Sequence, residues 1–163
     1  MESLIGIEKL IRHMAWANQQ VIAQLGELPD EALKAFLVNK EWTVAEIIRH
    51  ILSSADWYGF RLTGETPIEF AQPSSTKEMA EFSRMATIFD DRLLRACAVP
   101  DELIPREVDG KIIMRARSTV LSQAVHHATE HRAQLVAALE ANGYTDINLD
   151  DFDVWGYAGP IGE

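Results

Sequence analysis

The sequence predicts an all-α protein, a four-helix bundle with a long crossover connection between its second and third helices. Two observations lead to this fold class. Four long segments repeat apolar residues with the 3.6-residue period of a core-facing helix, and a single short stretch, 103–117, carries a β-hairpin signal. The 163 residues can bury one core, and no internal repeat or linker divides them, so we expect a single domain over residues 1–163.

The first two helices are predicted from an apolar stripe and from capping residues. The first pattern runs from about Leu4 to Leu25, and Asn18 interrupts its stripe. The second begins at Thr43, whose spacing to Glu46 fits a capping box, in which a hydroxyl and a carboxylate each accept a hydrogen bond from a free backbone amide. It is expected to end at Gly64.

The second half of the chain carries the remaining elements. Residues 64–76 lack a period and contain two prolines, which predicts a long loop. A second capping box, Ser75 to Glu78, precedes a third helix that reaches about Ala98. The Asp109-Gly110 pair predicts the hairpin turn. A fourth helix is expected from about Ser118 to Asn142, followed by an acidic, aromatic tail with one short helix.

Charge and composition exclude several classes of function. The net charge is −10 and the pI is near 4.9, with basic residues scattered among acids, which disfavours binding to nucleic acid or to an anionic membrane. No segment has the roughly 18 consecutive apolar residues of a membrane span. The opening residues are typical of a helix rather than of a signal peptide, so we expect a cytoplasmic protein. The lone Cys97 excludes an internal disulfide framework and is expected to be a small buried side chain.

Three histidines form the candidate functional site. His127 and His131 are four residues apart in the fourth helical pattern, so they lie one turn apart on one face of a helix. His50 lies in the second pattern and can reach the same point from across the bundle core. Imidazole is a common metal ligand, and three protein ligands leave a coordination position open for chemistry. The histidines therefore predict a site for one divalent metal ion, which can be zinc, nickel, iron or manganese.

This prediction depends on the three histidines together. An isolated pair at this spacing is more often a coincidence, and a lone histidine on an apolar face is more often a hydrogen-bonded core residue. Small or apolar neighbours turn all three toward the bundle interior, where each imidazole needs a partner and one shared cation satisfies them. His13 is interpreted as an ordinary helix residue and His126 as partly exposed, so neither is assigned to the site.

Three motifs follow one another along the chain. They are Trp16-Ala17-Asn18 with LPDEAL after it, EWTVAEIIRHILSSADWYGFRLTGE around His50, and HHATEHRAQL around His127 and His131. In this order and spacing they resemble the DinB/YfiT family of metal-dependent four-helix-bundle proteins, over nearly the whole chain. One departure is Ala133, where relatives often have glycine, a difference expected to affect helix packing more than the metal.

The resemblance implies a metal site and a type of chemistry. By position, the family's ligands fall on His50, His127 and His131, which would hold one divalent ion together with water. Relatives include transferases that join low-molecular-weight thiols (bacillithiol, mycothiol, glutathione) to electrophiles, and a thiol-dependent maleylpyruvate isomerase. We therefore expect a small-molecule thiol and an electrophile as partners. Homodimers are common among relatives, and a homodimer is expected here.

Further residues are expected to support this site. Side chains around the ligands should fix the tautomer of each histidine. The candidates for this role are Asn18, Glu46, Ser54, Glu130 and Gln134. Three aromatic residues, Trp57, Trp155 and Tyr157, can line the substrate entrance, although packing in the core or in a lid explains them equally well.

Other functions fit the same residues. His127, Glu130 and His131 match the His-x-x-Glu-His signature of inverted zincins, in which the glutamate is a general base for hydrolysis. Those enzymes usually have a third, acidic ligand in a larger α/β architecture, and His50 would then be unexplained. A small metal-dependent hydrolase that uses the three histidines, and a metal-binding stress-response module without catalysis, both remain alternatives to the transferase.

Overall fold

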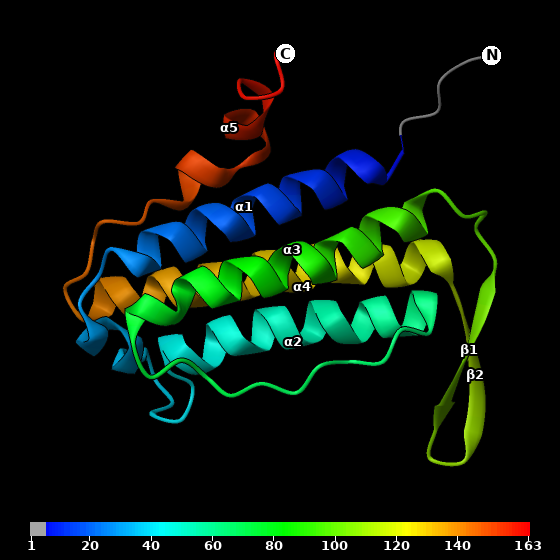
Figure 1. Cartoon of the computed structure of the whole chain (residues 1–163), viewed down its shortest axis with the longest axis horizontal. Coiled ribbons are helices and arrows are strands. Elements are labelled where there is room, and N and C mark those ends of the chain that lie inside the picture. Colours follow the sequence, from blue (N-terminus) through cyan, green and yellow to red (C-terminus); the bar gives the residue numbers. More distant parts are fainter. Residues whose placement is uncertain (1–5) are drawn as a thin grey trace.

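The structure, a computed structural model, describes residues 6–163 and contains the predicted four-helix bundle (Figure 1). Its long helices are α1 (Glu8–Gly26), α2 (Val44–Thr63), α3 (Met79–Cys97) and α4 (Arg117–Ala141). Shorter elements are the 3-10 helices η1 (Asp30–Lys34), η2 (Thr76–Glu78) and η3 (Leu149–Phe152), and the helix α5 (Val154–Ala158). No helix in this described part of the chain is both long and apolar enough to cross a membrane.

The predicted ends of the helices agree with the structure except at the first one. The expected start at Leu4 lies outside the described residues, and the described Gly6 and Ile7 precede the helix, which begins at Glu8. No side chain caps this end by a hydrogen bond. Helix α4 begins at Arg117, one residue before its predicted start, and Gly143 with φ of 87° follows its end.

The two predicted capping boxes differ in the structure. At Ser75 the box is complete, because Glu78 accepts a hydrogen bond from the Ser75 amide at 3.1 Å. At Thr43 only one half forms: the hydroxyl accepts from the Glu46 amide at 3.3 Å. The Glu46 carboxylate turns to Arg49 instead, with 2.9 Å between its Oε2 and the arginine Nε. A charged guanidinium is a stronger partner for this carboxylate than a backbone amide.

The long connection between α2 and α3 runs back along the bundle, so these two helices point in the same direction (Figure 1). A buried acid, Asp56 on α2, holds this connection in place. It accepts a hydrogen bond from the amide of Ile68 at 2.6 Å and forms an ion pair with Arg92 on α3. The predicted crossover is therefore confirmed, and one carboxylate joins both helices to the loop between them.

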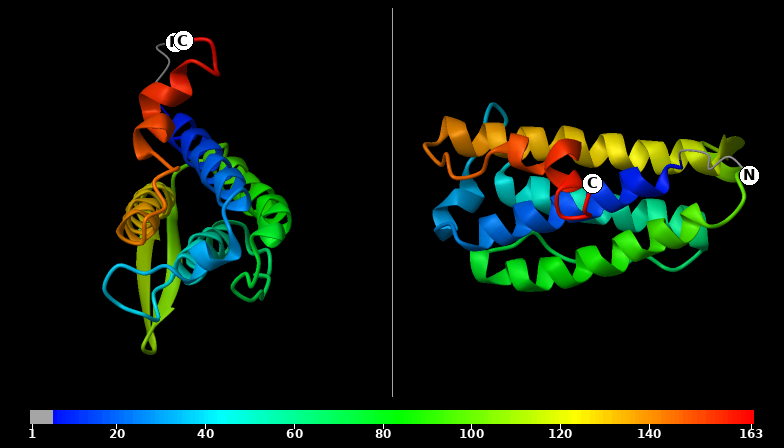
Figure 2. Two further views of the ribbon diagram at one scale, coloured as in Figure 1. Left: turned by 90° about the vertical axis from the view of Figure 1, so that its left-hand side faces the viewer. Right: turned by 90° about the horizontal axis from the view of Figure 1, so that it is seen from above.

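The four long helices pack around a continuous apolar core (Figure 2). Both α1 and α2 contact both α3 and α4, so α2 and α4 are neighbours along their length. The largest side chains that are almost wholly buried come from all four helices: Phe89, Ile11, Met14, Ile22, Leu25, Ile47, Ile48, Ile51, Leu52, Leu93, Leu121 and Leu135. Removing this apolar surface from water is the main force that holds the helices together.

The predicted hairpin is confirmed. It consists of β1 (Leu103–Val108) and β2 (Lys111–Ala116), paired antiparallel. Asp109 and Gly110 form its turn with φ values of 52° and 74°, a conformation that favours aspartate or asparagine followed by glycine. The hairpin projects from the end of the bundle where α3 ends and α4 begins (Figure 1).

The tail packs against the outer side of the bundle, where η3 contacts α4 and α5 contacts α1 (Figure 2). His13 fastens it: its Nε2 lies 2.8 Å from the carbonyl oxygen of Phe152, and its ring meets the ring of Tyr157 edge-on. His13 is therefore buried and makes a long-range contact, which the interpretation as an ordinary helix residue missed. Asp153 caps α5 by accepting a hydrogen bond from the Gly156 amide.

Cys97 is half-buried at the end of α3, less covered than its predicted burial. Its thiol donates a hydrogen bond to the carbonyl oxygen of Leu93, at 3.3 Å from sulfur to oxygen. Burial raises the pKa of this thiol, so Cys97 has little thiolate character at neutral pH.

A second group of buried polar side chains crosses the bundle. Arg132 on α4 donates to Asn18 on α1 at 2.7 Å, and the carboxyl group of Asp90 on α3 is fully enclosed nearby. Asp90 Oδ2 has no hydrogen-bond partner among residues 6–163. Burial raises the pKa of Asp90 to about 7, which the positive charge of Arg132 partly opposes. Asp90 therefore carries a proton in the folded protein under mildly acidic conditions.

This shift predicts how stability depends on pH. Between the unfolded pKa, 3.8, and the folded pKa of about 7, unfolding releases a proton from Asp90. The free energy of unfolding should therefore fall as the pH rises through this window, by up to about 1.4 kcal/mol per pH unit. The free energy of unfolding, measured in urea from pH 4.5 to 8 with chelator present, should fall less steeply with pH in Asp90→Asn than in wild type. As a control, Asp91→Asn at the exposed neighbouring position should keep the pH dependence of wild type. Parallel plots of unfolding free energy against pH for wild type and Asp90→Asn would contradict the raised pKa of Asp90.

Candidate metal centre

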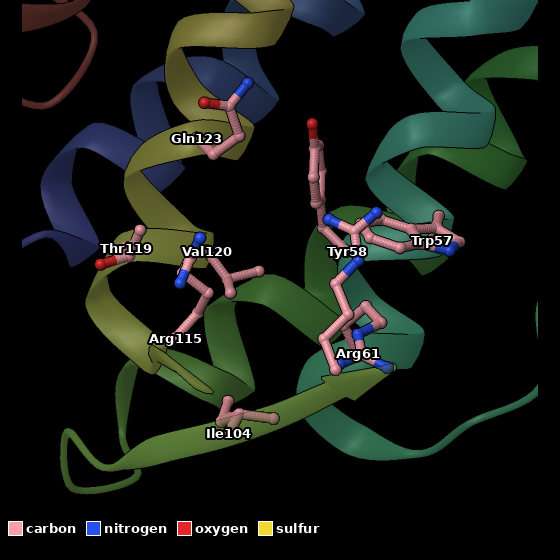
Figure 3. A pocket seen from close by; sticks show the side chains of 9 residues that line it. Trp57, Tyr58, Arg61, Ile104, Arg115, Thr119, Val120 and Gln123 are labelled. Carbon is pink, nitrogen blue, oxygen red and sulfur yellow. The ribbon is translucent and has the colours of Figure 1, made fainter. Parts of the chain in front are cut away.

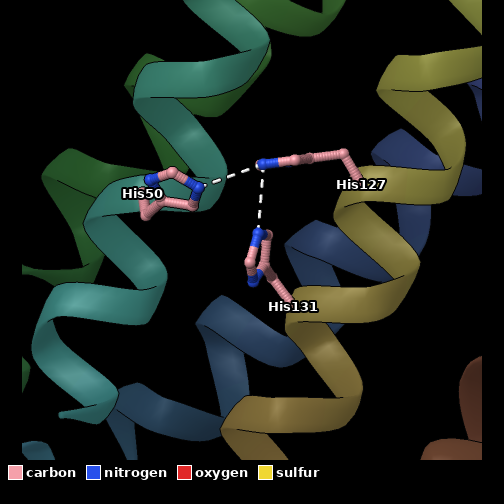
Figure 4. A group of neighbouring side chains, drawn as sticks. All are labelled: His50, His127 and His131. Atoms are coloured by element: carbon pink, nitrogen blue, oxygen red, sulfur yellow. Dashed lines mark hydrogen bonds between the residues drawn. The ribbon is translucent and has the colours of Figure 1, made fainter. Parts of the chain in front are cut away.

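Two neighbouring helices bring the three predicted histidines together (Figure 4). His127 and His131 project from consecutive turns of α4, and His50 faces them from α2. The Nε2 atom of His127 lies 3.0 Å from that of His50 and 3.0 Å from that of His131. One nitrogen from each ring falls within 4.8 Å of the others, an arrangement that could hold a metal ion.

The protonation of the rings fits a shared cation. The Nδ1 atom of His131 lies 2.9 Å from the Gln134 amide oxygen, which only accepts, so Nδ1 carries the proton and Nε2 is left with a lone pair. Burial lowers the pKa of His50, and burial followed by the charges of the other two histidines lowers the pKa of His127 to about 4. His50 and His127 are thus disposed to be neutral at pH 7, the form in which imidazole binds metal.

Hydrogen bonds alone do not satisfy this cluster. The Nε2 atom of a neutral imidazole has either a proton or a lone pair, so His127 can form a good hydrogen bond with only one of the two nitrogens beside it. The second contact is then left without a well-directed proton between its two nitrogens. A cation that accepts a lone pair from each of the three nitrogens removes this conflict, so the donor set fits a divalent metal.

Gln134 and Trp42 surround the cluster. The oxygen of Gln134 accepts from both His131 Nδ1 and Trp42 Nε1, at 2.9 Å each. The Trp42 ring also meets the rings of His50 and His131 edge-on, with 5.1 and 5.6 Å between centroids. Trp42 was not identified from the sequence, because it lies in the loop before α2, outside any helical period; its position just before the cap residue Thr43 is the only hint.

The other four candidates for orienting the histidines have different surroundings. Asn18 accepts from Arg132, and the Glu46 carboxylate binds Arg49, so neither forms the expected bond to an imidazole. The charge of Glu46 still opposes, without reversing, the lowering of the His50 pKa. In the part of the chain that the structure describes, Ser54 and Glu130 have no side-chain hydrogen bond; Ser54 is half-buried and Glu130 exposed.

The three aromatic candidates for the entrance are separated in space. Trp57 lines a cavity beside the histidines, between α2, α4 and the hairpin. Trp155 and Tyr157 are not among the residues that line this cavity; they lie in the tail, where η3 contacts α4 and α5 contacts α1. Tyr157 packs against the rings of His13 and Trp16, and Trp155 is 87% exposed on α5.

Tyr58 connects this cavity to the histidines. It lines the cavity (Figure 3). Its ring lies edge-on to that of His127, with 5.8 Å between centroids. Burial raises the pKa of its phenol, which therefore stays protonated and able to donate a hydrogen bond at neutral pH. A molecule in the cavity would thus have the imidazole cluster and a phenolic hydroxyl next to each other.

Comparison with known proteins agrees with this architecture. The sequence profile described as the DinB family matches residues 1–157. The chain belongs to the DinB family. Among curated proteins, this DinB-family member is similar to Protein DinB of Bacillus subtilis (strain 168), at 24% identity over 153 residues, covering 87% of this chain and 89% of that protein. No solved structure gives a significant match.

The geometry predicts which histidines are needed to bind metal. Loaded with zinc, nickel or manganese, the protein should hold about one ion per chain, since each ring supplies one nitrogen. His50→Ala, His127→Ala and His131→Ala should each weaken binding by more than about 100-fold, beyond the usual effect of a residue that only supports a ligand. The exposed His126 is a matched control on the same helix, and His126→Ala should bind as wild type does.

Elemental analysis and competition with a chromophoric chelator measure both quantities. A full complement of tightly held metal in His50→Ala would contradict a three-ligand site.

Gln134 gives a second prediction. Gln134→Ala removes the acceptor that holds the His131 proton at Nδ1, and metal affinity should fall by about 10- to 100-fold. Gln134→Glu keeps an oxygen in this position and should retain most of the affinity. Chelator competition on both variants makes the comparison; equal losses in the two would show that the acceptor does not matter.

Proposed function

We propose that this protein holds one divalent cation with His50, His127 and His131, and that it is an enzyme that transfers a low-molecular-weight thiol to an electrophile. The observation that carries the proposal is the convergence of three imidazole nitrogens beside a cavity. Membership of the DinB family supports it, because the family is associated with metal-dependent chemistry.

The chemistry follows from the charge of the ligands. Three neutral imidazoles leave a bound divalent cation with its full charge, and such a cation lowers the pKa of a coordinated thiol far below its free value of about 8.5. The thiol sulfur then forms a bond to the electrophilic carbon. The leaving group departs with the electrons of the broken bond, and the thiol proton passes to solvent.

The surrounding residues have separate tasks in this proposal. Gln134 keeps the proton of His131 on Nδ1, away from the cluster. Trp42 is held by the same oxygen and covers one side of His50 and His131, which limits the access of water. The protonated phenol of Tyr58 can donate a hydrogen bond to a substrate in the cavity.

The single cysteine of the sequence, Cys97, is poorly suited to be the nucleophile of this reaction. Cys97 donates to a backbone carbonyl on α3 and has a raised pKa, so the sulfur must come from a substrate. Glu130, the base of the inverted-zincin interpretation, is exposed, and in the described part of the chain it makes no hydrogen bond to the histidines. These two features favour thiol transfer over hydrolysis by that mechanism.

A turnover assay with a panel of thiols tests the proposal. With 1-chloro-2,4-dinitrobenzene as electrophile, the metal-loaded protein should form the thioether faster than the uncatalysed reaction with at least one of bacillithiol, mycothiol, glutathione or cysteine. Chelator or His127→Ala should lower the rate by at least about 100-fold, a loss of about 2.7 kcal/mol of transition-state stabilisation. Added metal should restore the chelated wild type, and His126→Ala should match it throughout.

The alternatives give different results. Chelator-sensitive hydrolysis of ester or amide substrates without thioether formation would identify a hydrolase. Tight metal binding without either activity would identify a metal-binding module, and both results would contradict the transferase.

A further inference from the structure

The cavity beside the histidines has a chemical character of its own. Its volume is about 450 Å³, and it is formed by the second half of α2, the hairpin and the first half of α4 (Figure 3). Tyr58 and Gln123 lie on opposite sides of it, on α2 and α4. Because Tyr58 touches His127 and Gln123 lies one turn before His127, the cavity opens directly beside the candidate metal centre.

Three arginines line this cavity: Arg61 from α2, Arg106 from β1 and Arg115 from β2. No acidic residue is among its lining residues, although the chain has 25 acidic and only 15 basic residues. Among residues 6–163, none of the three forms an ion pair, whereas seven other basic side chains do. The cavity is therefore a local concentration of unneutralised positive charge in a strongly acidic protein.

The hairpin register places two of these arginines on one face. Ile104 pairs with Arg115, and Arg106 pairs with Ile113, so these four side chains share the face that lines the cavity. Glu107, the acid next in sequence, lies on the opposite face of the ribbon. The alternation of the strands thus separates the arginines from the acid that could otherwise neutralise them.

The side chains of the three arginines make contacts within the protein but keep N–H donors free for a ligand. The Arg61 guanidinium donates to the carbonyl oxygen of Pro105, and Arg115 Nη1 donates to that of Met114 at 2.9 Å. The guanidinium carbons of Arg61 and Arg106 lie 5.8 and 5.0 Å from the centre of the Trp57 ring. Each guanidinium has more N–H donors than these contacts occupy, and neighbouring positive charges repel one another, so an anion would relieve an existing cost.

We propose that Arg61, Arg106 and Arg115 form an anion-binding subsite that recognises a carboxylate or phosphate group of the substrate. Arginine forks match the planar carboxylate and the phosphate oxygens, and Trp57 packs against the rest of the ligand. This proposal makes the proposed function more specific, and the role of the subsite in the reaction depends on that function. One of the two substrates therefore carries a negatively charged group, and this substrate is either the thiol or the electrophile.

Direct binding tests the subsite without catalysis. Isothermal titration of the chelated wild-type protein with succinate and with inorganic phosphate should give saturable binding of at least one of them. Arg106→Gln and Arg115→Gln should each weaken it by about tenfold, as expected for one charge-assisted hydrogen bond, and the double variant by more. Lys111→Gln is a matched control, because it removes one positive charge from the same hairpin without touching the cavity.

Circular dichroism should show native helix content for all of these variants. Equal affinities in wild type and the double variant, equal binding of the neutral diamide of succinate, or no binding of either anion would each overturn the subsite.

Kinetics distinguish the two sources of the anion. If the thiol carries it, Arg106→Gln should raise KM for mercaptosuccinate by about tenfold more than it raises KM for 2-mercaptoethanol. If the electrophile carries it, the same variant should raise KM for 4-chloro-3,5-dinitrobenzoate and not for 1-chloro-2,4-dinitrobenzene. Equal changes in KM for the charged and the neutral substrate in both series would contradict a role of Arg106 in recognising the anion. A failed transferase proposal would look different, because turnover would be absent while the anion still bound in the calorimeter.

Discussion

The side-by-side packing of α2 and α4 brings the three histidines of the candidate site together. His50 and Tyr58 come from one helix, and His127, His131 and Gln134 from the other. A shift of one helix by a single turn would move its side chains by about 5.4 Å, enough to separate the nitrogens that now lie 3.0 Å apart. The apolar core alone tolerates such slips poorly, and the polar contacts of Asp56 with Arg92 and the Ile68 amide oppose them further.

The same packing explains why the site is built from neutral ligands next to charged surroundings. Burial between two helices disfavours the protonated form of His50 and His127, which leaves lone pairs directed at one point. The arginines of the hairpin lie one step further out, where the cavity meets solvent. A substrate with a negative group would thus encounter positive charge first and the imidazole cluster second, an order that suits an acidic protein because long-range repulsion would otherwise keep anions away.

Helical periodicity and capping residues were enough to predict the fold and to bring His50, His127 and His131 to one interior face. These signals are local, and residues four apart on a helix can meet in only one way. The failures concern contacts between distant segments. Trp42 reaches Gln134 across 92 positions, and His13 meets Phe152 across 139 positions, and no spacing rule encodes either pair. The cluster of Arg61, Arg106 and Arg115 required both the strand register and the placement of the hairpin against α2, neither of which a single sequence specifies.

The docking of residues 144–163 on α1 has a consequence for synthesis of the chain. The outer face of α1 is covered by segments more than a hundred positions downstream, through His13 with Phe152 and through the ion pair of Lys9 with Glu163. A ribosome must therefore release nearly the whole chain before Trp16 and its neighbours are shielded from water. Until then this aromatic surface is open to chaperones and to association with other chains, and premature termination within the tail would leave it exposed to water.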